Sequence, residues 1–147
     1  MWVVTREGEP LSVSGGGEFL LSSHGSAMIF YNMQEANKLM HNTVDISKNM
    51  DWNWGKPNDY ELQAIDETVG DEEVFFWTVK TLGTYLQTIN IRGRGSFLDK
   101  AQDRHATTFR TKEAAQEAIV ETMKVANLLG VDWGLDIRFS IRKMVKI

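Results

Sequence analysis

The sequence contains no cysteine, and it has only two prolines and three histidines. Without cysteine the chain cannot form disulfides, iron–sulfur clusters or thiolate zinc sites, and it has no thiol nucleophile. His24, His41 and His105 are scattered and offer little for any other transition-metal site. We therefore expect no metal and no cofactor. So few prolines, with 12 glycines, also exclude collagen-like and proline-rich low-complexity sequence.

Long hydrophobic runs are also missing. No apolar stretch approaches the roughly 20 residues that a membrane-spanning helix needs. The N-terminal residues have no basic region followed by a long apolar stretch, so we expect no secretory signal and a cytoplasmic location. A hydrophobic content of 42% over 147 residues can still bury one compact core or two very small ones.

Charge is distributed unevenly along the chain. Residues 1–75 hold 4 Lys/Arg against 13 Asp/Glu, a net charge of −9, and residues 76–147 hold 12 against 7, a net charge of +5. The asymmetry indicates either that the second half meets an anionic ligand, or that the acidic half of one copy meets the basic half of another in a homo-oligomer. The alternative is that both halves simply face solvent.

An internal repeat organises the sequence. Residues 2–11 align with residues 77–86 at a constant offset of 75 and share Trp, Val, Gly and Leu. Later matches pair Phe19-Leu20 with Phe97-Leu98, Ala27, Phe30 and Ala36 with Ala106, Phe109 and Ala115, Asp51-Trp52 with Asp132-Trp133, and Tyr60–Ile65 with Asp136–Ile141. We predict a tandem duplication with units at 1–70 and 74–147. Two segments that converged in pattern are the alternative.

Each unit is expected to contain a β-hairpin, short strands, a helix and a closing strand. The strands predicted in the first unit are Trp2–Glu7, Leu11–Ser14, Phe19–Ser22, Ala27–Phe30 and Glu61–Glu67, and the closing strand of the second is Asp136–Lys143. Asn32 and Thr111 are predicted N-caps, and Gly130 ends the second helix. The segment Asn42–Tyr60 has no clear period and is predicted to be a long loop. The result is an α+β protein with a mostly antiparallel sheet, helices on one face and a pseudo-twofold axis.

Basic residues of the second unit are the main candidates for ligand binding. Arg92 and Arg94 alternate with glycines in Ile91–Ser96, where converging backbone N–H groups and two guanidinium groups favour a phosphate or carboxylate. A solvated hairpin tip has the same pattern. A second basic group lies just before and at a predicted helix N-terminus, which also attracts anions, and it consists of Arg104, His105, Arg110 and Lys112. Arg142 and Lys143, on the closing strand, face either solvent or a ligand.

Aromatic residues add one further candidate. Trp54 has no counterpart in the repeat, which makes it the best candidate for an exposed, stacking aromatic. Trp2 and Trp77 lie at equivalent strand positions and are assigned to the core. Phe76 and Tyr85 are considered as residues that stack on nucleic-acid bases.

No catalytic motif is present. The acidic run Asp66–Glu73 has five carboxylates in eight residues without the spacing of a calcium loop, so a solvated turn between units is favoured. Asp103-Arg104-His105 resembles part of a catalytic set, but adjacent strand residues point to opposite faces. There is no phosphate-binding loop of the Gly-x-x-x-x-Gly-Lys type and no Gly-x-Ser-x-Gly or His-Glu-x-x-His motif, so we do not expect an enzyme.

Two resemblances bear on function. An opening Trp-x-Val strand, then Ala-x-x-Phe before a capped Glu-Ala helix (Ala27, Phe30, Glu35-Ala36; Ala106, Phe109, Glu113-Ala114), resembles small accessory proteins of bacteriophages and prophages. That resemblance implies a non-catalytic protein in the host cytoplasm that blocks a host defence complex or sequesters a cyclic-nucleotide immune signal. Four strands followed by a helix, repeated, is similar to the single-strand-binding repeats of purine-element proteins. The extra closing strand and the acidic first unit depart from that pattern.

These observations predict a non-catalytic binding protein that captures a host protein or a small anionic nucleotide, without a membrane partner. Arg92, Arg94, Arg104 and Arg110 are the predicted anion contacts, and Trp54 the predicted stacking residue. Single-stranded nucleic acid bound by the basic second unit is the alternative.

Overall fold

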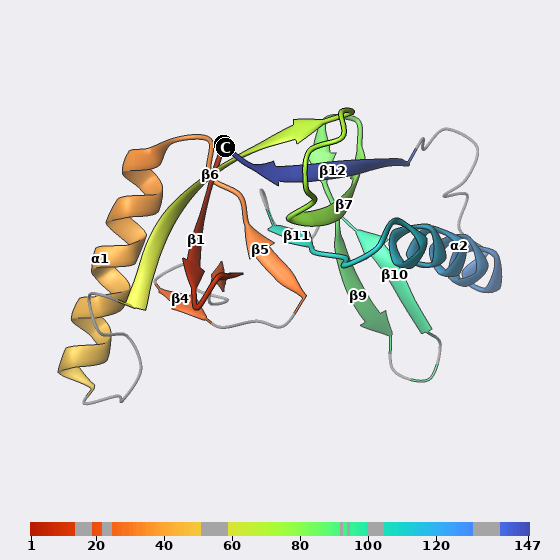
Figure 1. The fold of residues 1–147 in the computed structure, drawn as a ribbon. Helices are drawn as coiled ribbons and strands as arrows, with labels where there is room; N and C mark the ends of the chain where they lie inside the picture. The colour runs from red at the N-terminus through yellow and green to blue at the C-terminus, as the bar shows by residue number, and fades with distance from the viewer. Residues whose placement is uncertain are drawn as a thin grey trace. The chain divides into compact units, whose positions relative to one another are not determined.

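The computed structural model describes residues 1–13, 19–21, 25–50, 59–91, 93, 95–99, 105–130 and 139–147. The chain is α+β, and the described residues contain two helices and mostly antiparallel strand pairs (Figure 1). It divides into two compact units: unit 1 is Met1–Asp66 with Lys146–Ile147, and unit 2 is Glu67–Val145. Neither described helix is long and apolar enough to cross a membrane.

Unit 1 is built from short strands and one helix. Its elements are β1 (Trp2–Arg6), β2 (Glu9–Pro10), β3 (Ser12–Val13), β4 (Leu20–Leu21), β5 (Ser26–Met28), α1 (Met33–Asn49) and β6 (Tyr60–Thr68), the last two residues of which belong to unit 2. β1 pairs antiparallel with β2 and β6, and β3 pairs with β4. The alternating pattern of the first strand therefore predicts β1 correctly, to within one residue at its end.

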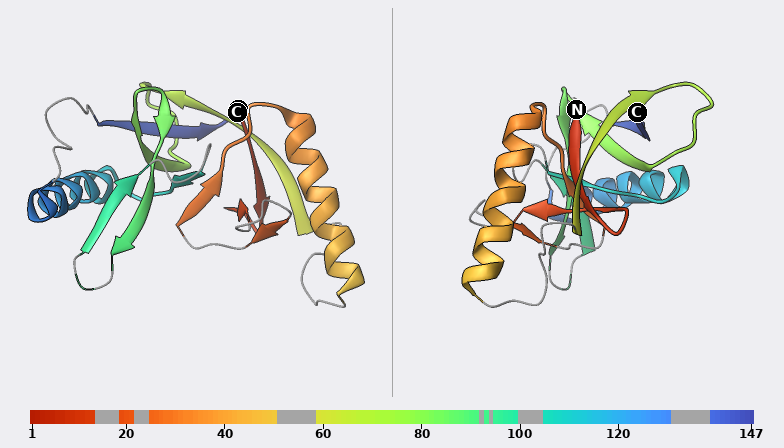
Figure 2. Two further views of the ribbon diagram at one scale, coloured as in Figure 1. Left: turned by 180° about the vertical axis from the view of Figure 1, so that it is seen from behind. Right: turned by 60° about the vertical axis from the view of Figure 1, so that its left-hand side comes forward.

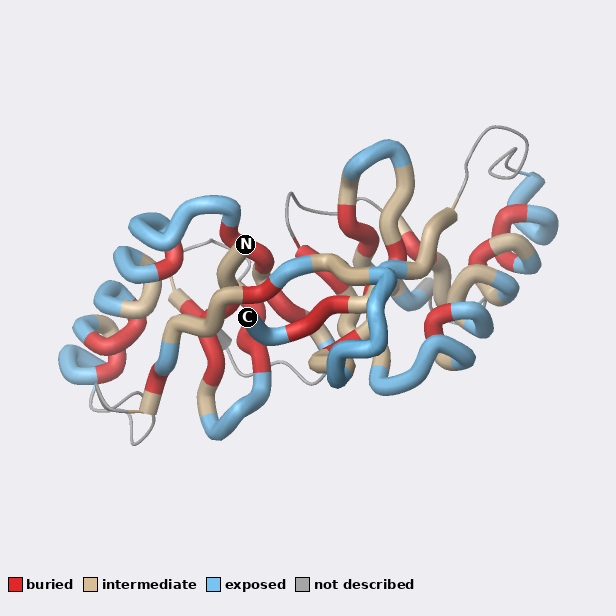
Figure 3. The backbone as a smooth tube through the Cα atoms, turned by 45° about the horizontal axis from the view of Figure 1, so that its top comes forward, coloured by how far each residue is buried: buried red, intermediate tan, exposed pale blue. Residues whose placement is uncertain are grey.

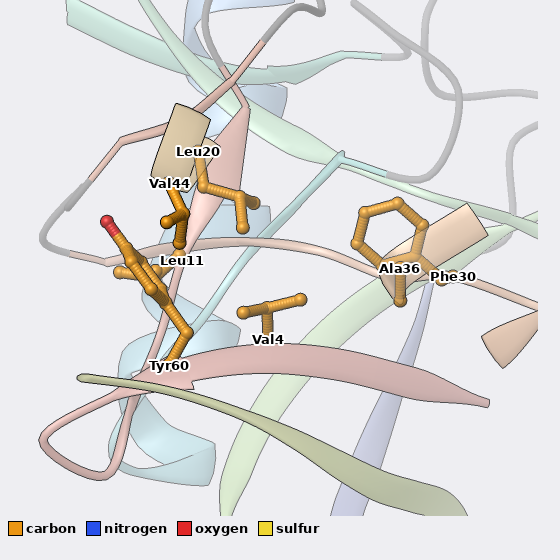
Figure 4. Packing of buried hydrophobic residues seen from close by; sticks show 7 residues of the cluster. All are labelled: Val4, Leu11, Leu20, Phe30, Ala36, Val44 and Tyr60. Carbon is orange, nitrogen blue, oxygen red and sulfur yellow. The ribbon is translucent and has the colours of Figure 1, made fainter. Parts of the chain in front are cut away.

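The core of unit 1 lies between these strands and α1. Its buried side chains are Val4, Leu11, Leu20, Phe30, Ala36, Val44 and Tyr60 (Figure 4). Leu39 and Met40, which follow Ala36 at helical spacing, pack against this cluster. In Figure 3, α1 is therefore buried on the side that faces the strands of unit 1 and exposed on the other side.

Helix α1 begins as predicted but is longer than predicted. The side chain of Asn32 accepts hydrogen bonds from the backbone N–H groups of Gln34 and Glu35, at 2.7 and 3.3 Å. The helix then continues to Asn49, so the expectation of a loop is wrong for residues 42–49. Thr43, Val44 and Ser47 form its buried side there. Two of these three are polar, so the buried face does not appear in the hydropathy pattern, and two are β-branched, which lowers the helix propensity of the segment.

Unit 2 repeats this order of elements. They are β7 (Phe76–Thr81), β8 (Thr84–Tyr85), β9 (Gln87–Ile91), β10 (Gly95–Asp99), β11 (His105–Thr107), α2 (Lys112–Leu129) and β12 (Ser140–Lys146), the last residue of which belongs to unit 1. β7 pairs antiparallel with β8 and β12, and β9 with β10 (Figure 2). α2 is capped as predicted, by the Thr111 hydroxyl, which accepts from Ala114 N at 3.1 Å, and by Gly130 at φ 66°.

Both units use the same backbone hydrogen bonds. Trp2 exchanges two bonds with Phe30 at 2.7 and 2.8 Å, and Trp77 exchanges two with Phe109 at 2.8 and 2.7 Å. In each hairpin a leucine N–H donates at 3.0 Å to a valine carbonyl, Leu11 to Val4 and Leu86 to Val79. Each hairpin also turns through two positive φ angles, 54° and 80° at residues 7–8 and 48° and 80° at residues 82–83.

A threonine on each helix makes the same two contacts. Thr43 Oγ1 accepts from Leu20 N at 2.8 Å and donates to Leu39 O, four residues earlier on the helix. Thr122 Oγ1 accepts from Leu98 N at 2.9 Å and donates to Ala118 O. Each hydroxyl therefore ties the helix of its unit to a neighbouring strand.

The closing strands match with a different offset from the predicted one. Leu62 lies opposite Val4, and Ile141 lies opposite Val79, which sets an offset of 79. The predicted match of Tyr60 with Asp136 has an offset of 76 and is wrong by three residues. An odd shift inverts the two faces of a strand. At the observed offset, the fully buried Ile65 corresponds to the fully buried Met144. The strand begins at Ser140, and residues 136–138 lie outside the described residues.

Candidate binding site

Most of the predicted site residues lie outside the described part of the chain. Arg92, Arg94, Arg104 and Trp54 belong to the undescribed segments, as do Trp52 and Trp133. Arg110 is described, and it is exposed immediately before the N-cap Thr111 of α2. The grouping of these residues around one anion therefore stays a prediction.

The segment Arg92–Arg94 connects the paired strands β9 and β10. Ile91 lies opposite Gly95, and Gln87 lies opposite Asp99, so residues 92–94 join the two strands. Gly93 and Gly95 have φ angles of 76° and 105°, a region that favours glycine, and this explains the glycine spacing of the segment.

This hairpin is longer than its counterpart in unit 1. Eleven residues separate Leu86 from Leu98, whereas eight separate Leu11 from Leu20. The two pairs are equivalent, because the first leucine of each donates to a valine carbonyl and the second to a threonine hydroxyl. Three residues of the β9–β10 hairpin therefore have no counterpart in unit 1.

Helix α2 holds the β10 side of the hairpin. Leu98 N donates to Thr122 Oγ1, and Leu98 is fully buried. A Cβ added to Gly95 would lie 3.2 Å from Val125 Cγ2 and 2.6 Å from the movable carboxylate of Glu121, and the φ angle of 105° disfavours any side chain, so glycine suits this close approach of strand to helix. Strand β10 thus contacts α2 at two points, at Leu98 near the base of the hairpin and at Gly95 next to its turn.

A charged network in unit 2 was not predicted. Glu67 Oε1 accepts from Lys80 Nζ at 3.0 Å and from Tyr85 Oη, while Arg142 Nη1 lies 3.9 Å from Glu67 Oε2. Burial alone would raise the pKa of Glu67, but hydrogen bonds from Tyr85 and Lys80 and the charges of Lys80 and Arg142 together lower it. Four residues spread from 67 to 142 share no local spacing, so only the pairing of the strands reveals this network.

The network changes the interpretation of the closing strand. Arg142 is directed to Glu67, and Lys143 Nζ donates to the carbonyl oxygen of Gly70 at 3.1 Å. These two side chains already have contacts within unit 2. They are therefore weaker candidates for ligand contacts than Arg92 and Arg94.

Two of the predicted stacking aromatics are buried. Tyr85 is 1% exposed and Phe76 is 4% exposed, so neither can stack on a base, and that expectation is wrong. Trp2 is partly buried and packs against the core of unit 1, as predicted. Trp77 is also only partly exposed.

The remaining candidates for chemistry have structural explanations. His105 is buried, its Nε2 has no hydrogen-bond partner, and burial lowers its pKa, so the imidazole is neutral at pH 7. In the acidic run, residues 69–73 are exposed and the Glu72 carboxylate accepts from the Thr68 hydroxyl, as expected for a solvated turn. Within the described ranges, no three potential metal ligands come together.

Comparison with known proteins adds no relative. No family model, no curated protein and no solved structure matches this chain.

Proposed function

We propose that the chain is a tandem duplication of one α+β unit with its helix on one face of the sheet. Equivalent hydrogen bonds at the tryptophan, leucine and threonine positions support this, as does the matching pair of positive φ angles in each hairpin. Several of these atoms are backbone atoms, and their spacing follows the sequence repeat. Convergence would have to reproduce all of them in the same order.

We further propose that the protein is a non-catalytic binding protein and that the β9–β10 hairpin of unit 2 is its recognition element. The observation that carries this proposal is the length of the hairpin. Its three additional residues have no counterpart in the sequence of unit 1, and its connection carries Arg92 and Arg94. Guanidinium groups next to glycine form bidentate contacts with phosphate or carboxylate groups.

The ligand proposed is a small anionic nucleotide, or an acidic surface of a host protein. The net charge of +5 over residues 76–147 favours an anion of either kind. The resemblance to bacteriophage accessory proteins points to a host defence component or its nucleotide signal, and to a homo-oligomer in the host cytoplasm. Arg104, Arg110 and Trp54 remain proposed additional contacts.

Native mass spectrometry and calorimetry test this proposal. The freshly purified protein is weighed under native conditions for subunit number and retained ligand, and is then titrated with a cyclic dinucleotide. We expect Arg92→Ala/Arg94→Ala to abolish binding without changing the free energy of unfolding. Lys38→Ala/Lys48→Ala removes two exposed positive charges from α1 of unit 1, which holds none of the predicted anion contacts, and is the matched control. Equal affinity of the two double variants would contradict the assignment.

Single-stranded nucleic acid is the alternative ligand. Its binding requires the release of counterions from several phosphates, so its affinity falls steeply with salt. An oligothymidylate that binds at about 50 mM salt and is released by salt, while the cyclic dinucleotide does not bind, would favour this alternative.

A further inference from the structure

Unit 2 contains a cavity that the proposed hairpin site does not use. Its volume is about 240 Å³. It lies between β10 and the C-terminal half of α2 and is lined by Phe97, Asp99, Thr122, Val125, Ala126 and Leu129. Cavities of about 150 Å³ with apolar walls are large enough to hold a benzene ring. This one therefore has room for a ring and a short substituent.

The walls of the cavity are held in place by the contacts between strand and helix. Leu98 N is bonded to Thr122 Oγ1, and Gly95 brings β10 into close contact with Glu121 and Val125. Val125 is 2% exposed, whereas Leu129 is 38% exposed and stands at the rim. A preformed cavity binds without the entropic cost of ordering its walls.

The polar groups of the lining determine which ligand fits. The Thr122 hydroxyl already donates to Ala118 O and accepts from Leu98 N. Among the described lining residues, Asp99 is the one with a charged side chain. Asp99 already interacts with another group of the protein. A carboxylate accepts up to about four hydrogen bonds, so it can also accept from a ligand. The ring of Phe97 offers a second attraction for a cation.

We propose that this cavity binds a small organic cation, a primary amine attached to one aromatic ring or to a branched chain of similar size. The apolar part lies among Val125, Ala126 and Leu129, and the ammonium group donates to Asp99. This inference is independent of the anion site proposed for the hairpin, because it uses none of its arginines and requires the opposite charge.

Unit 1 supplies the substitution for the test. When Thr43 is aligned with Thr122, Ile46 of unit 1 aligns with Val125 of unit 2. Isoleucine has one more methylene than valine, so unit 1 carries a larger side chain at the position that lines the cavity in unit 2. Val125→Ile fills part of the cavity with the residue of the other unit. Val120→Ile makes the same change at a 53% exposed position of α2 and is the matched control.

The experiment is an NMR titration of the full chain with benzylamine, compared with benzyl alcohol and benzoate. We expect benzylamine to bind and to shift the amide signals of Phe97, Asp99 and Val125. Asp99→Asn should lower its affinity about tenfold and leave benzyl alcohol within about twofold, because asparagine still accepts a hydrogen bond but lacks the negative charge that attracts the ammonium group. Val125→Ile should weaken both ligands, and Val120→Ile neither.

Three results would overturn the proposal. They are no saturable binding of benzylamine, equal binding of benzoate, and benzylamine binding that both Asp99→Asn and Val125→Ile leave unchanged. Unfolding by urea shows whether each variant is folded. Because Arg92→Ala/Arg94→Ala should not affect benzylamine, failure here and failure of the hairpin proposal are separate results.

Discussion

Units 1 and 2 make the same backbone contacts with different side chains. In the first hairpin of unit 1, Thr5 lies opposite Pro10. At the equivalent pair of unit 2, Lys80 lies opposite Tyr85, and both side chains donate hydrogen bonds to Glu67. The backbone bonds and the helix threonine therefore define the unit, while side chains at paired positions of its hairpin differ, buried ones included. Binding functions are expected at the differences, and stability at the shared contacts.

The shared threonines are the strongest test of that division. Thr43→Val and Thr122→Val each leave one buried backbone N–H, of Leu20 or Leu98, without an acceptor. We expect each to lower the free energy of unfolding by about 1–3 kcal/mol, and by similar amounts, in urea titrations. A loss in only one of the two units would break the comparison.

The Glu67 network should stabilise unit 2 alone, and in a pH-dependent way. Because the folded-state pKa of Glu67 lies below its ordinary value of 4.5, its contribution is present above that pH and is lost as the pH falls through the folded value. We expect Tyr85→Phe to cost about 1 kcal/mol at pH 7. Glu67→Gln should differ from the native chain at pH 7 and much less at pH 3. Glu9→Gln, at an exposed position of β2, is the control, and its loss should be small at both pH values.

His105 should give unit 2 a second, smaller pH dependence. Burial lowers the pKa of His105, so the folded state binds fewer protons than the unfolded state, and the free energy of unfolding falls as the pH drops below the ordinary value of 6.5. We expect His105→Gln to reduce the slope between pH 7 and 5, measured by urea unfolding at each pH. His41→Gln, on the exposed side of α1, should leave the slope unchanged.

The hairpin turns should give the smallest effect, and the same sign in both units. Glu7 and Leu82 have φ angles of 54° and 48°, and Leu82 is 87% exposed, so little packing would be lost on substitution. Glu7→Asn and Leu82→Asn should each raise the free energy of unfolding by roughly 0.5–1 kcal/mol, because asparagine adopts this conformation at lower cost. A decrease at Leu82 would show that its side chain makes a stabilising contact.

Much of the local structure was predictable because its signals are local. The N-caps Asn32 and Thr111, the terminal Gly130 and the alternating residues of β1 were identified from neighbours a few positions away. The second half of α1 was missed because its inner face uses Thr43 and Ser47. The hydroxyls of these residues bond to carbonyl oxygens of the helix itself, at Leu39 and Val44, so polar groups are buried without cost to hydrogen bonding.

The candidate sites were less predictable than the elements. Sequence spacing singled out Arg92 and Arg94 through their glycine neighbours, and the described glycines have the positive φ angles that this pattern implies. It gave no signal for the cavity beside Phe97 and Asp99. A cavity arises from the sizes of side chains that meet across two elements, here 23 or more residues apart in the chain.

By itself, the sequence determined the α+β class, the order of elements in each unit, the helix caps and the uneven charge, because each depends on residues near one another in the chain. Only the tertiary structure decided the register of the closing strands, the burial of Tyr85 and Phe76, the Glu67 network and the cavity of unit 2. These depend on which strands become neighbours and on how closely β10 approaches α2. Strand pairing and close packing bring together residues that are distant in sequence. The free energy that they contribute depends on which residues meet, and neighbouring residues in the chain do not reveal this.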